Sequence, residues 1–347
     1  NISKLKDQGS IMHSLHFFIF AVVFSKTCGF QPPEFEKCDV EDDKHWFCKK
    51  GLQYFDNFCD QDESKAACKQ TCNLCNGPPT PPPVPKPICG VSKVSQSRVV
   101  NGEDAPEGAY PWIASLQIRV AIENVKSHFC GGTLIHPKWV LTAAHCFDFG
   151  NFSMNAIMPF IHVELGIHDQ DKEESTSQLR NIKNAFESPD LGVKDGTLYG
   201  DLLLLELDVP VMLNDRVNLP CLPDKEEYPT IGQSCVVAGW GIREYPSEKT
   251  GGILQQTRLP VVGPNHIGCH SNTEVICVGH GFGTQANGKQ HPNACKGDSG
   301  GPLVCQQPNG SWKFVGVASY VHTYCKYYTA YAPVGKYLPW IKEHVPL

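Results

Sequence analysis

The chain has 347 residues, a formal net charge of −6 at neutral pH and 17 cysteines. A chain of this length can form one large core and a small accessory module. Its mildly acidic balance offers no basic surface, so we expect no nucleic-acid partner. So many cysteines are unusual in a reducing compartment and favour disulfides in a secreted, extracellular protein.

The first part of the chain contains an apolar run over residues 17–24, which is typical of a signal peptide and too short to span a bilayer. A buried strand is the alternative, but nothing amphipathic surrounds the run. We therefore expect residues 1–29 to comprise upstream residues and a signal peptide. Loss of Cys28 with this leader would leave an even number of cysteines, and no later stretch predicts a membrane span.

Two segments of unusual composition follow. Residues 38–75 hold six closely spaced cysteines, which indicate a small disulfide-linked module or, as the alternative, a zinc site. Residues 76–88 are rich in proline, which cannot donate backbone hydrogen bonds, so they predict an extended linker.

Residues 99–347 have the texture of an all-β domain. Glycines separate short alternating apolar runs such as WIASLQIRV and CVVAGWG, which predict many short antiparallel strands in a barrel or sandwich. Only KYLPWIKEHV, at residues 336–345, has a helical pattern, and we expect its Pro339 near the first turn.

The stretch GDSGGP, residues 297–302, places Ser299 between small residues. A serine hydroxyl is a weak nucleophile and needs a base, a group that orients the base, and donors for an oxyanion. Gly297 allows its own N–H and that of Ser299 to converge on one point. We expect the base at His145 in VLTAAHC and the orienting carboxylate at Asp201, where an imidazole N–H would compensate a buried charge.

Each of these signals has an ordinary alternative: a strand start for Asp201, a core residue or metal ligand for His145, and a turn for GDSGGP. In this order, however, they resemble the chymotrypsin-type serine proteases from Cys89 to the C-terminus, as do RVVNG, VAGWG and YLPWI. The resemblance implies two six-stranded antiparallel β-barrels with a C-terminal helix. It also implies acyl-enzyme catalysis by Ser299, His145 and Asp201 with no metal or cofactor.

The resemblance further implies a zymogen. Residues 89–98 would form the activation segment, which a trypsin-like protease would cut after Arg98. The freed ammonium of Val99 would pair with Asp298 and order the oxyanion donors. The alternative is that Arg98 is only an exposed charge.

Five disulfides of the protease region are implied by the resemblance, and the first would keep the N-terminal segment attached after cleavage. They are Cys89–Cys221, Cys130–Cys146, Cys235–Cys305, Cys269–Cys277 and Cys295–Cys325.

Specificity is expected to depend on residues around the substrate pocket. Asn293 stands where trypsin-like members have an aspartate, which disfavours Lys or Arg before the scissile bond. Val321 and Thr329 are branched residues at the two wall positions, which resembles the elastases and favours Ala or Val. Ser319 and Tyr320 are expected to bind the substrate backbone. Chymotrypsin-like specificity for large apolar residues is the alternative.

The six-cysteine module resembles the ShK-type domain, which implies the pairs Cys38–Cys75, Cys48–Cys68 and Cys59–Cys72 among fifteen possible pairings. Toxins of this type block potassium channels with a Lys-aromatic pair. Here Lys65 is followed by Ala66, so we expect a docking or spacing role. The chain is therefore interpreted as a monomeric protease for protein or peptide substrates, with a toxin-like binding protein on an inert protease scaffold as the alternative.

Two further expectations concern the surface. Ile167 stands where the family's calcium loop requires a carboxylate, so we expect the following acidic run HDQDKEE to be solvated. Asn151 and Asn309 lie in glycosylation sequences.

Overall fold

The structure is a computed structural model in which the chain divides into two units, residues 1–86 and residues 87–347. The predicted signal peptide, six-cysteine module, linker and Arg98–Val99 junction lie outside the described residues. Within the described residues, no helix is long and apolar enough to cross a membrane. The described residues are 89–94, 102–120, 125–194, 196–242, 250–263, 266–281, 291–321 and 325–347.

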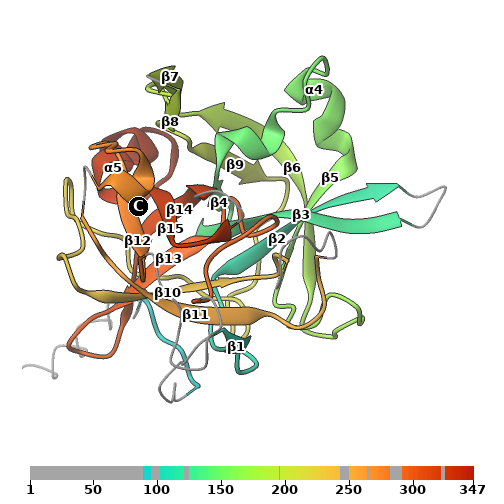
Figure 1. Cartoon of the computed structure of the whole chain (residues 1–347). Coiled ribbons are helices and arrows are strands. Elements are labelled where there is room, and N and C mark those ends of the chain that lie inside the picture. The colour runs from blue at the N-terminus through green and yellow to red at the C-terminus, as the bar shows by residue number, and fades with distance from the viewer. Residues whose placement is uncertain are drawn as a thin grey trace, which may run out of the picture. The chain divides into compact units, whose positions relative to one another are not determined.

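Six strands form a closed antiparallel barrel in the order β2-β3-β4-β9-β6-β5 (Figure 1). Leucine side chains contribute much of the barrel core, and Leu116, Leu134 and Leu165 are completely buried. Closure leaves no strand edge unpaired, which confirms the first expected barrel. The strands are β2 (Ile113–Val120), β3 (Val125–His136), β4 (Trp139–Thr142), β5 (Ile161–Leu165), β6 (Gln178–Glu187) and β9 (Leu203–Leu207).

Seven strands form a second sheet in the order β1-β11-β10-β13-β14-β15-β12. We expected a second closed six-stranded barrel, but the structure shows an open sheet. Beyond the end of β11, contact with β12 is limited to a bridge between Val261 and Val278 and a hydrogen bond from the Val262 N–H to the Cys277 carbonyl at 2.9 Å. The strands are β1 (Glu103–Asp104), β10 (Ser234–Gly239), β11 (Gln255–Pro260), β12 (Ile276–Gly279), β13 (Pro302–Gln306), β14 (Trp312–Val321) and β15 (Tyr328–Pro333).

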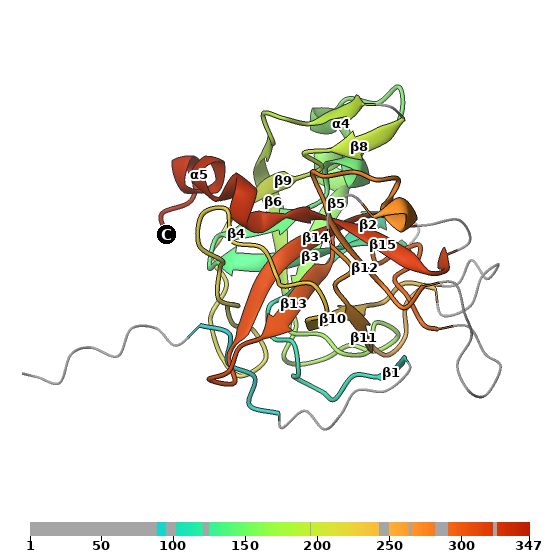
Figure 2. The same ribbon diagram turned by 60° about the vertical axis from the view of Figure 1, so that its left-hand side comes forward.

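The C-terminal helix, α5 (Val334–His344), follows β15 directly (Figure 2). Pro339 lies in the interior of this helix, so our expectation that it would lie near the first turn is wrong. A proline there cannot bond to the carbonyl four residues earlier, which belongs to Gly335. That carbonyl accepts a hydrogen bond from the Glu226 N–H at 3.0 Å instead, which removes part of the cost.

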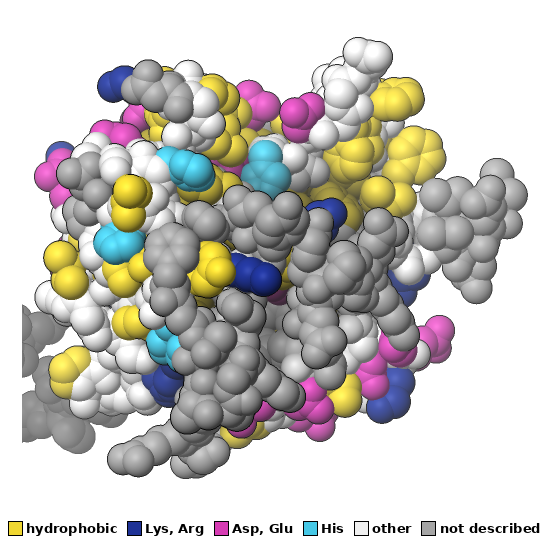
Figure 3. Space-filling model, viewed as in Figure 1, with side chains coloured by type: hydrophobic (Ala, Val, Ile, Leu, Met, Phe, Trp, Pro, Cys, Tyr) yellow, Lys and Arg dark blue, Asp and Glu magenta, His cyan; other side chains and the backbone are white. Residues whose placement is uncertain are grey.

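Short helices and a two-stranded ribbon lie outside the barrel and the seven-stranded sheet. Apolar side chains gather beside α4 on the face seen in Figure 3, and Phe152 and Phe160, which lie close to α4 in sequence, are exposed. The short elements are the 3₁₀ helices η3 (Ala144–Phe147), η4 (Met158–Phe160) and η5 (Ile267–Cys269), the helix α4 (Met154–Ile157), and a ribbon of β7 (Gly192–Lys194) and β8 (Thr197–Tyr199).

The segment that begins at Cys89 is fastened to the start of β14. The Gly90 N–H donates to Leu219, and the Gly90 carbonyl accepts from the Trp312 N–H, both at 2.8 Å. Gly90 has φ +66°, and a Cβ atom there would collide with the Trp312 carbonyl. This position therefore requires glycine. Lys93 adds an ion pair to Asp215 at 2.6 Å.

All five disulfides predicted for the protease region are confirmed. The Cys89–Cys221 bond joins residues 132 apart in the sequence, and the Cys130–Cys146 bond lies next to His145. The remaining three bonds are Cys235–Cys305, Cys269–Cys277 and Cys295–Cys325.

Candidate active site

Asp201 and His145 are joined by two hydrogen bonds. His145 lies in η3, directly after β4, and Asp201 lies just before β9, which pairs with β4. Asp201 Oδ1 accepts from the His145 backbone N–H at 2.9 Å, and Asp201 Oδ2 lies 2.7 Å from His145 Nδ1. The carboxylate thus fixes both the position and the orientation of the imidazole ring, whose Nε2 remains available.

Ser319, from β14, provides a third hydrogen bond to the same carboxylate. Its Oγ donates to Asp201 Oδ2 at 2.6 Å, although the two residues are 118 positions apart. Burial raises the pKa of Asp201, but the hydrogen bonds and charge interaction with His145 and the Ser319 hydroxyl outweigh it and hold the pKa below its usual value. Sequence reasoning gave Ser319 only a role in substrate binding, because no local pattern signals this contact.

The Ser299 loop is bound to the barrel beside His145. The Ser299 carbonyl accepts from the Gly131 N–H at 2.7 Å, and Gly131 follows Cys130 of the disulfide next to His145. Within the described residues Ser299 Oγ makes no hydrogen bond to His145, and such bonds often tighten only when substrate is bound. Gly297 has φ +96°, and a Cβ atom there would lie 3.0 Å from the Gly241 Cα, so only glycine suits this position.

The proposed metal-ligand alternative for His145 is not supported by its neighbours. A ring nitrogen of His145 and the sulfur atoms of Cys130 and Cys146 lie within 4.8 Å of one another. Both sulfur atoms, however, belong to one disulfide. They therefore provide no thiolate to a metal ion.

The half-buried Asp298 lies next to Ser299 and receives two backbone hydrogen bonds. Its carboxylate accepts from the N–H groups of Gly241 and Cys295, both at 2.9 Å. Burial raises the pKa of Asp298 to about 6, although these hydrogen bonds lower it. No cation reaches Asp298 among the residues that the structure describes, which exclude its expected partner Val99.

A cavity of about 140 Å³ lies beside Ser299, between residues 294–299 and the end of β14, with Thr329 of β15 in its wall. Val321 and Thr329, both of which line it, are paired across the two strands. The Thr329 hydroxyl donates to Asn293 Oδ1 at 2.7 Å, and Asn293 itself does not line the cavity. The Asn293 Nδ2 atom is buried and has no partner among the described residues.

Tyr320 borders the same cavity but its hydroxyl points elsewhere. The hydroxyl donates to the Cys269 carbonyl at 3.3 Å and accepts from Asn272 at 3.2 Å. These contacts fix the side chain against the turn that the Cys269–Cys277 disulfide closes. The backbone of Tyr320 is thereby held beside the cavity.

The acidic run after Ile167 is more ordered than we expected. Glu174 Oε1 accepts from the backbone N–H groups of His168 and Asp169, at 2.9 and 2.7 Å, and the other carboxylate oxygen pairs with Arg216 at 3.0 Å. Asp169 is only 8% exposed. Part of this run therefore closes its own loop, and the expectation of a wholly solvated segment is wrong.

His128, on β3, contacts the loop of Gly297 and Ser299. Its Nε2 lies 2.9 Å from the Gly297 carbonyl and its Nδ1 lies 2.9 Å from Ser115 Oγ. Burial lowers the pKa of His128 to about 4, and the Gly297 carbonyl opposes this only in part. The ring is therefore neutral at pH 7.

The geometry can be compared with known families. A family model described as Trypsin matches residues 99–341, which is most of the chain.

The buried histidine makes a prediction about stability. The pKa of His128 is about 6.5 in the unfolded chain and about 4 in the folded one, so its contribution is complete above pH 6.5 and is lost as the pH falls through 4. The loss is on the order of 3 kcal/mol. Asp298 acts in the opposite direction, because its raised pKa favours the folded protein as the carboxylate is protonated below pH 6.

Urea unfolding at pH 7 and pH 4 should therefore show a smaller loss of stability in His128→Gln than in its parent, both carrying Ser299→Ala. Equal losses would contradict the prediction.

Proposed function

Because the chain belongs to the trypsin family of serine endopeptidases, we propose that it hydrolyses peptide bonds through an acyl-enzyme on Ser299. Ser299 Oγ would attack the scissile carbonyl carbon while His145 Nε2 takes its proton. The same proton would then pass to the leaving amine, and water would hydrolyse the ester by the reverse sequence. The observation that carries this proposal is the double hydrogen bond that orients His145 against Asp201.

The oxyanion would be bound by the backbone N–H groups of Gly297 and Ser299. The left-handed conformation of Gly297 and the Ser299 carbonyl contact to Gly131 support this role, since both restrain the loop before substrate arrives. Donors held in place in advance need no rearrangement when the negative charge develops.

We infer that activity requires cleavage between Arg98 and Val99 by a trypsin-like protease. The support lies in Asp298, whose carboxylate is enclosed by backbone donors and has a raised pKa. An incoming ammonium would compensate this charge and keep it ionised. The Cys89–Cys221 disulfide would then hold the severed segment to the enzyme.

Specificity of the elastase kind is proposed from the pocket. A cavity of about 150 Å³ is sufficient for benzene, so the volume here does not by itself reject a ring. The paired side chains of Val321 and Thr329 narrow the space instead, and Thr329 separates Asn293 from it. Small aliphatic residues before the scissile bond fit this shape, while chymotrypsin-like preference remains the competing outcome.

The proposed setting is a secreted monomer with an N-terminal ShK-type module in a protein-docking or spacing role. The predicted leader and the five disulfides support secretion. Asn151 and Asn309 are both exposed, which suits glycosylation in that setting.

Replacement of the nucleophile is the direct test of the proposed reaction. Ser299→Ala should reduce kcat on a peptide substrate by on the order of a million-fold, because no other hydroxyl can form the acyl-enzyme. Binding of an unreactive peptide should change little. A Ser299→Ala protein that retained substantial turnover would refute the assignment.

The activation step makes a separate prediction. Arg98→Gln should remain inactive after trypsin treatment, whereas the parent should become active with a new N-terminus at Val99. On gels the two parts of the cleaved parent should separate only after reduction. Separation without reductant would contradict the Cys89–Cys221 tether.

The pocket predicts an order of substrates. Rates on peptides that vary before the scissile bond should fall from Ala and Val to Phe, with Arg last because it would lose water without gaining a counter-charge. Val321→Gly combined with Thr329→Gly should move the preference to Phe or Leu. Thr329→Ser is the matched control, because it keeps the hydroxyl for Asn293 and removes only a methyl group. Preference of the parent for Phe or Arg would overturn the proposed specificity.

A further inference from the structure

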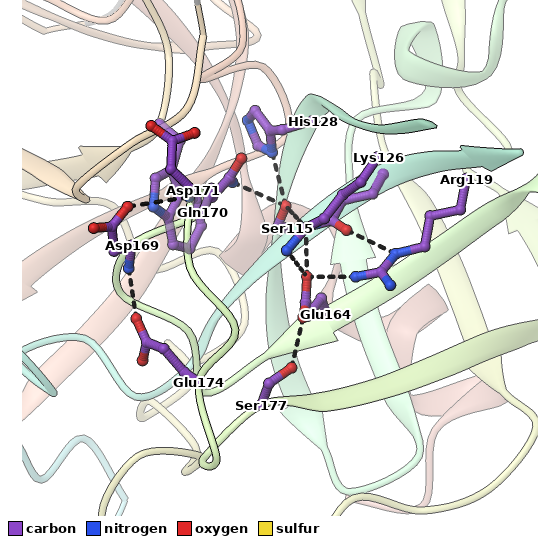
Figure 4. Close-up of polar contacts among 12 residues, drawn as sticks. Ser115, Arg119, Lys126, His128, Glu164, Asp169, Gln170, Asp171, Glu174 and Ser177 are labelled. Carbon is purple, nitrogen blue, oxygen red and sulfur yellow. Dashed lines mark hydrogen bonds and ion pairs between the residues drawn. The ribbon is translucent and has the colours of Figure 1, made fainter. Parts of the chain in front are cut away.

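A largely buried polar network runs from Glu164 through Ser115 to His128 (Figure 4). From His128 it reaches the Gly297 carbonyl. At one end is Glu164 of β5, which is 6% exposed and pairs with Arg119 at 2.8 Å and Lys126 at 3.0 Å. At the other end is His128, whose Nε2 meets Gly297. None of the side chains in this network belongs to the proposed catalytic group.

The side-chain amide of Gln117 can adopt only one orientation within this network. Its Oε1 accepts from Arg119 Nε at 3.0 Å, a group that can only donate. Its Nε2 donates to Glu164 Oε2 at 2.6 Å. Burial raises the pKa of Glu164, but hydrogen bonds and nearby cations hold it below its usual value, so this carboxylate only accepts. Rotation of the amide would place donor against donor and acceptor against acceptor.

This orientation determines what the Ser115 hydroxyl can do. A hydroxyl has two acceptor positions and one proton. The Nε2 atoms of Gln117 and Gln170 each lie 3.0 Å from Ser115 Oγ and fill both acceptor positions. With both amides donating in this way, the remaining proton points to His128 Nδ1, 2.9 Å away.

The tautomer of His128 follows from the same count. If Nδ1 accepts, the proton of the neutral ring is on Nε2, which then donates to the Gly297 carbonyl. With the opposite tautomer a lone pair of Nε2 would face that carbonyl, and the contact would become repulsive. The peptide group after Gly297 would then be held only through its N–H, which Asp298 donates to the Cys295 carbonyl at 2.9 Å.

We propose that Gln117 and Gln170 are positioning residues for the oxyanion loop, because they hold His128 in the tautomer whose Nε2–H binds the Gly297 carbonyl. Arg119 contributes by fixing the amide of Gln117. The catalytic part of this inference rests on the proposed function, since it assumes that Gly297 supplies an oxyanion donor. The tautomer itself does not depend on that function.

Nitrogen NMR of the protein with labelled histidine measures the tautomer directly. In Ser299→Ala at pH 7 we expect His128 Nε2 to be protonated and Nδ1 unprotonated, with the signals assigned by their loss in His128→Gln. Gln170→Glu should move the ring proton from Nε2 to Nδ1, because its carboxylate accepts the Ser115 proton and leaves Ser115 to accept from His128. A proton on Nδ1 in the parent, or no change in Gln170→Glu, would overturn the proposal.

Kinetics of the activated enzyme test the positioning role. At pH 8, Gln170→Glu should lower kcat by about tenfold with little change in KM, since the oxyanion donors act mainly in the transition state. An unchanged kcat, despite an altered tautomer, would show that the tautomer does not position the loop. If the activated parent enzyme showed no turnover of peptide substrates, the proposed function would be refuted. The NMR result on the His128 tautomer would still be valid.

A matched pair isolates the part of Arg119. Arg119→Met and Lys126→Met each remove one cation from the same oxygen of Glu164, but only Arg119 also binds Gln117. We expect Arg119→Met to lower kcat by about threefold or more and to populate the second His128 tautomer, and Lys126→Met to do neither. Equal effects would show that Arg119 acts only through the charge of Glu164. Should Arg119→Met fail to fold, Gln170→Glu, at a partly exposed position, carries the test.

Discussion

A single buried carboxylate joins the two halves of the proposed active site. Asp201 comes from the barrel, and two of its hydrogen bonds go to His145 of the same barrel, but its third partner, Ser319, belongs to the second sheet. An unpaired charge at this depth would be costly, so the three donors stabilise the contact between barrel and sheet. The position of the imidazole relative to the Ser299 loop therefore depends on the packing of the whole domain.

Glycine and buried histidine serve the same site in different ways. Gly297 adopts a conformation that side chains rarely tolerate, so the loop gains its shape without strain. A flexible loop, however, needs restraint from outside. The Gly131 N–H on one side and the His128 ring on the other supply it through carbonyl contacts to Ser299 and Gly297. The proposed oxyanion donors are thus restrained by the barrel as well as by their own sheet, where the Gly300 N–H donates to the Ala318 carbonyl at 2.8 Å.

Local motifs explain what the sequence could predict. The runs around His145, Asp201 and Ser299 are each short, and the alternation of the strands marks the all-β class. Contacts between distant segments have no local sequence motif, since Ser319 and Asp201 meet only when β14 packs against the barrel. The second sheet includes β1, a two-residue strand too short to recognise from the sequence. Pro339 was misplaced because its compensation comes from Glu226, far away in the chain.

The attachment at Gly90 also determines where a mechanical load would enter the domain. Any pull on the chain before Cys89 acts on the Cys89–Cys221 bond and on Trp312, at the first residue of β14. Ser319 lies near the opposite end of that strand, roughly 20 Å away at 3.3 Å per residue. Cross-strand bonds to β13 and β15 would share the force before it reached the substrate pocket. A load on this side would therefore enter the domain at the end of β14 far from the proposed substrate pocket.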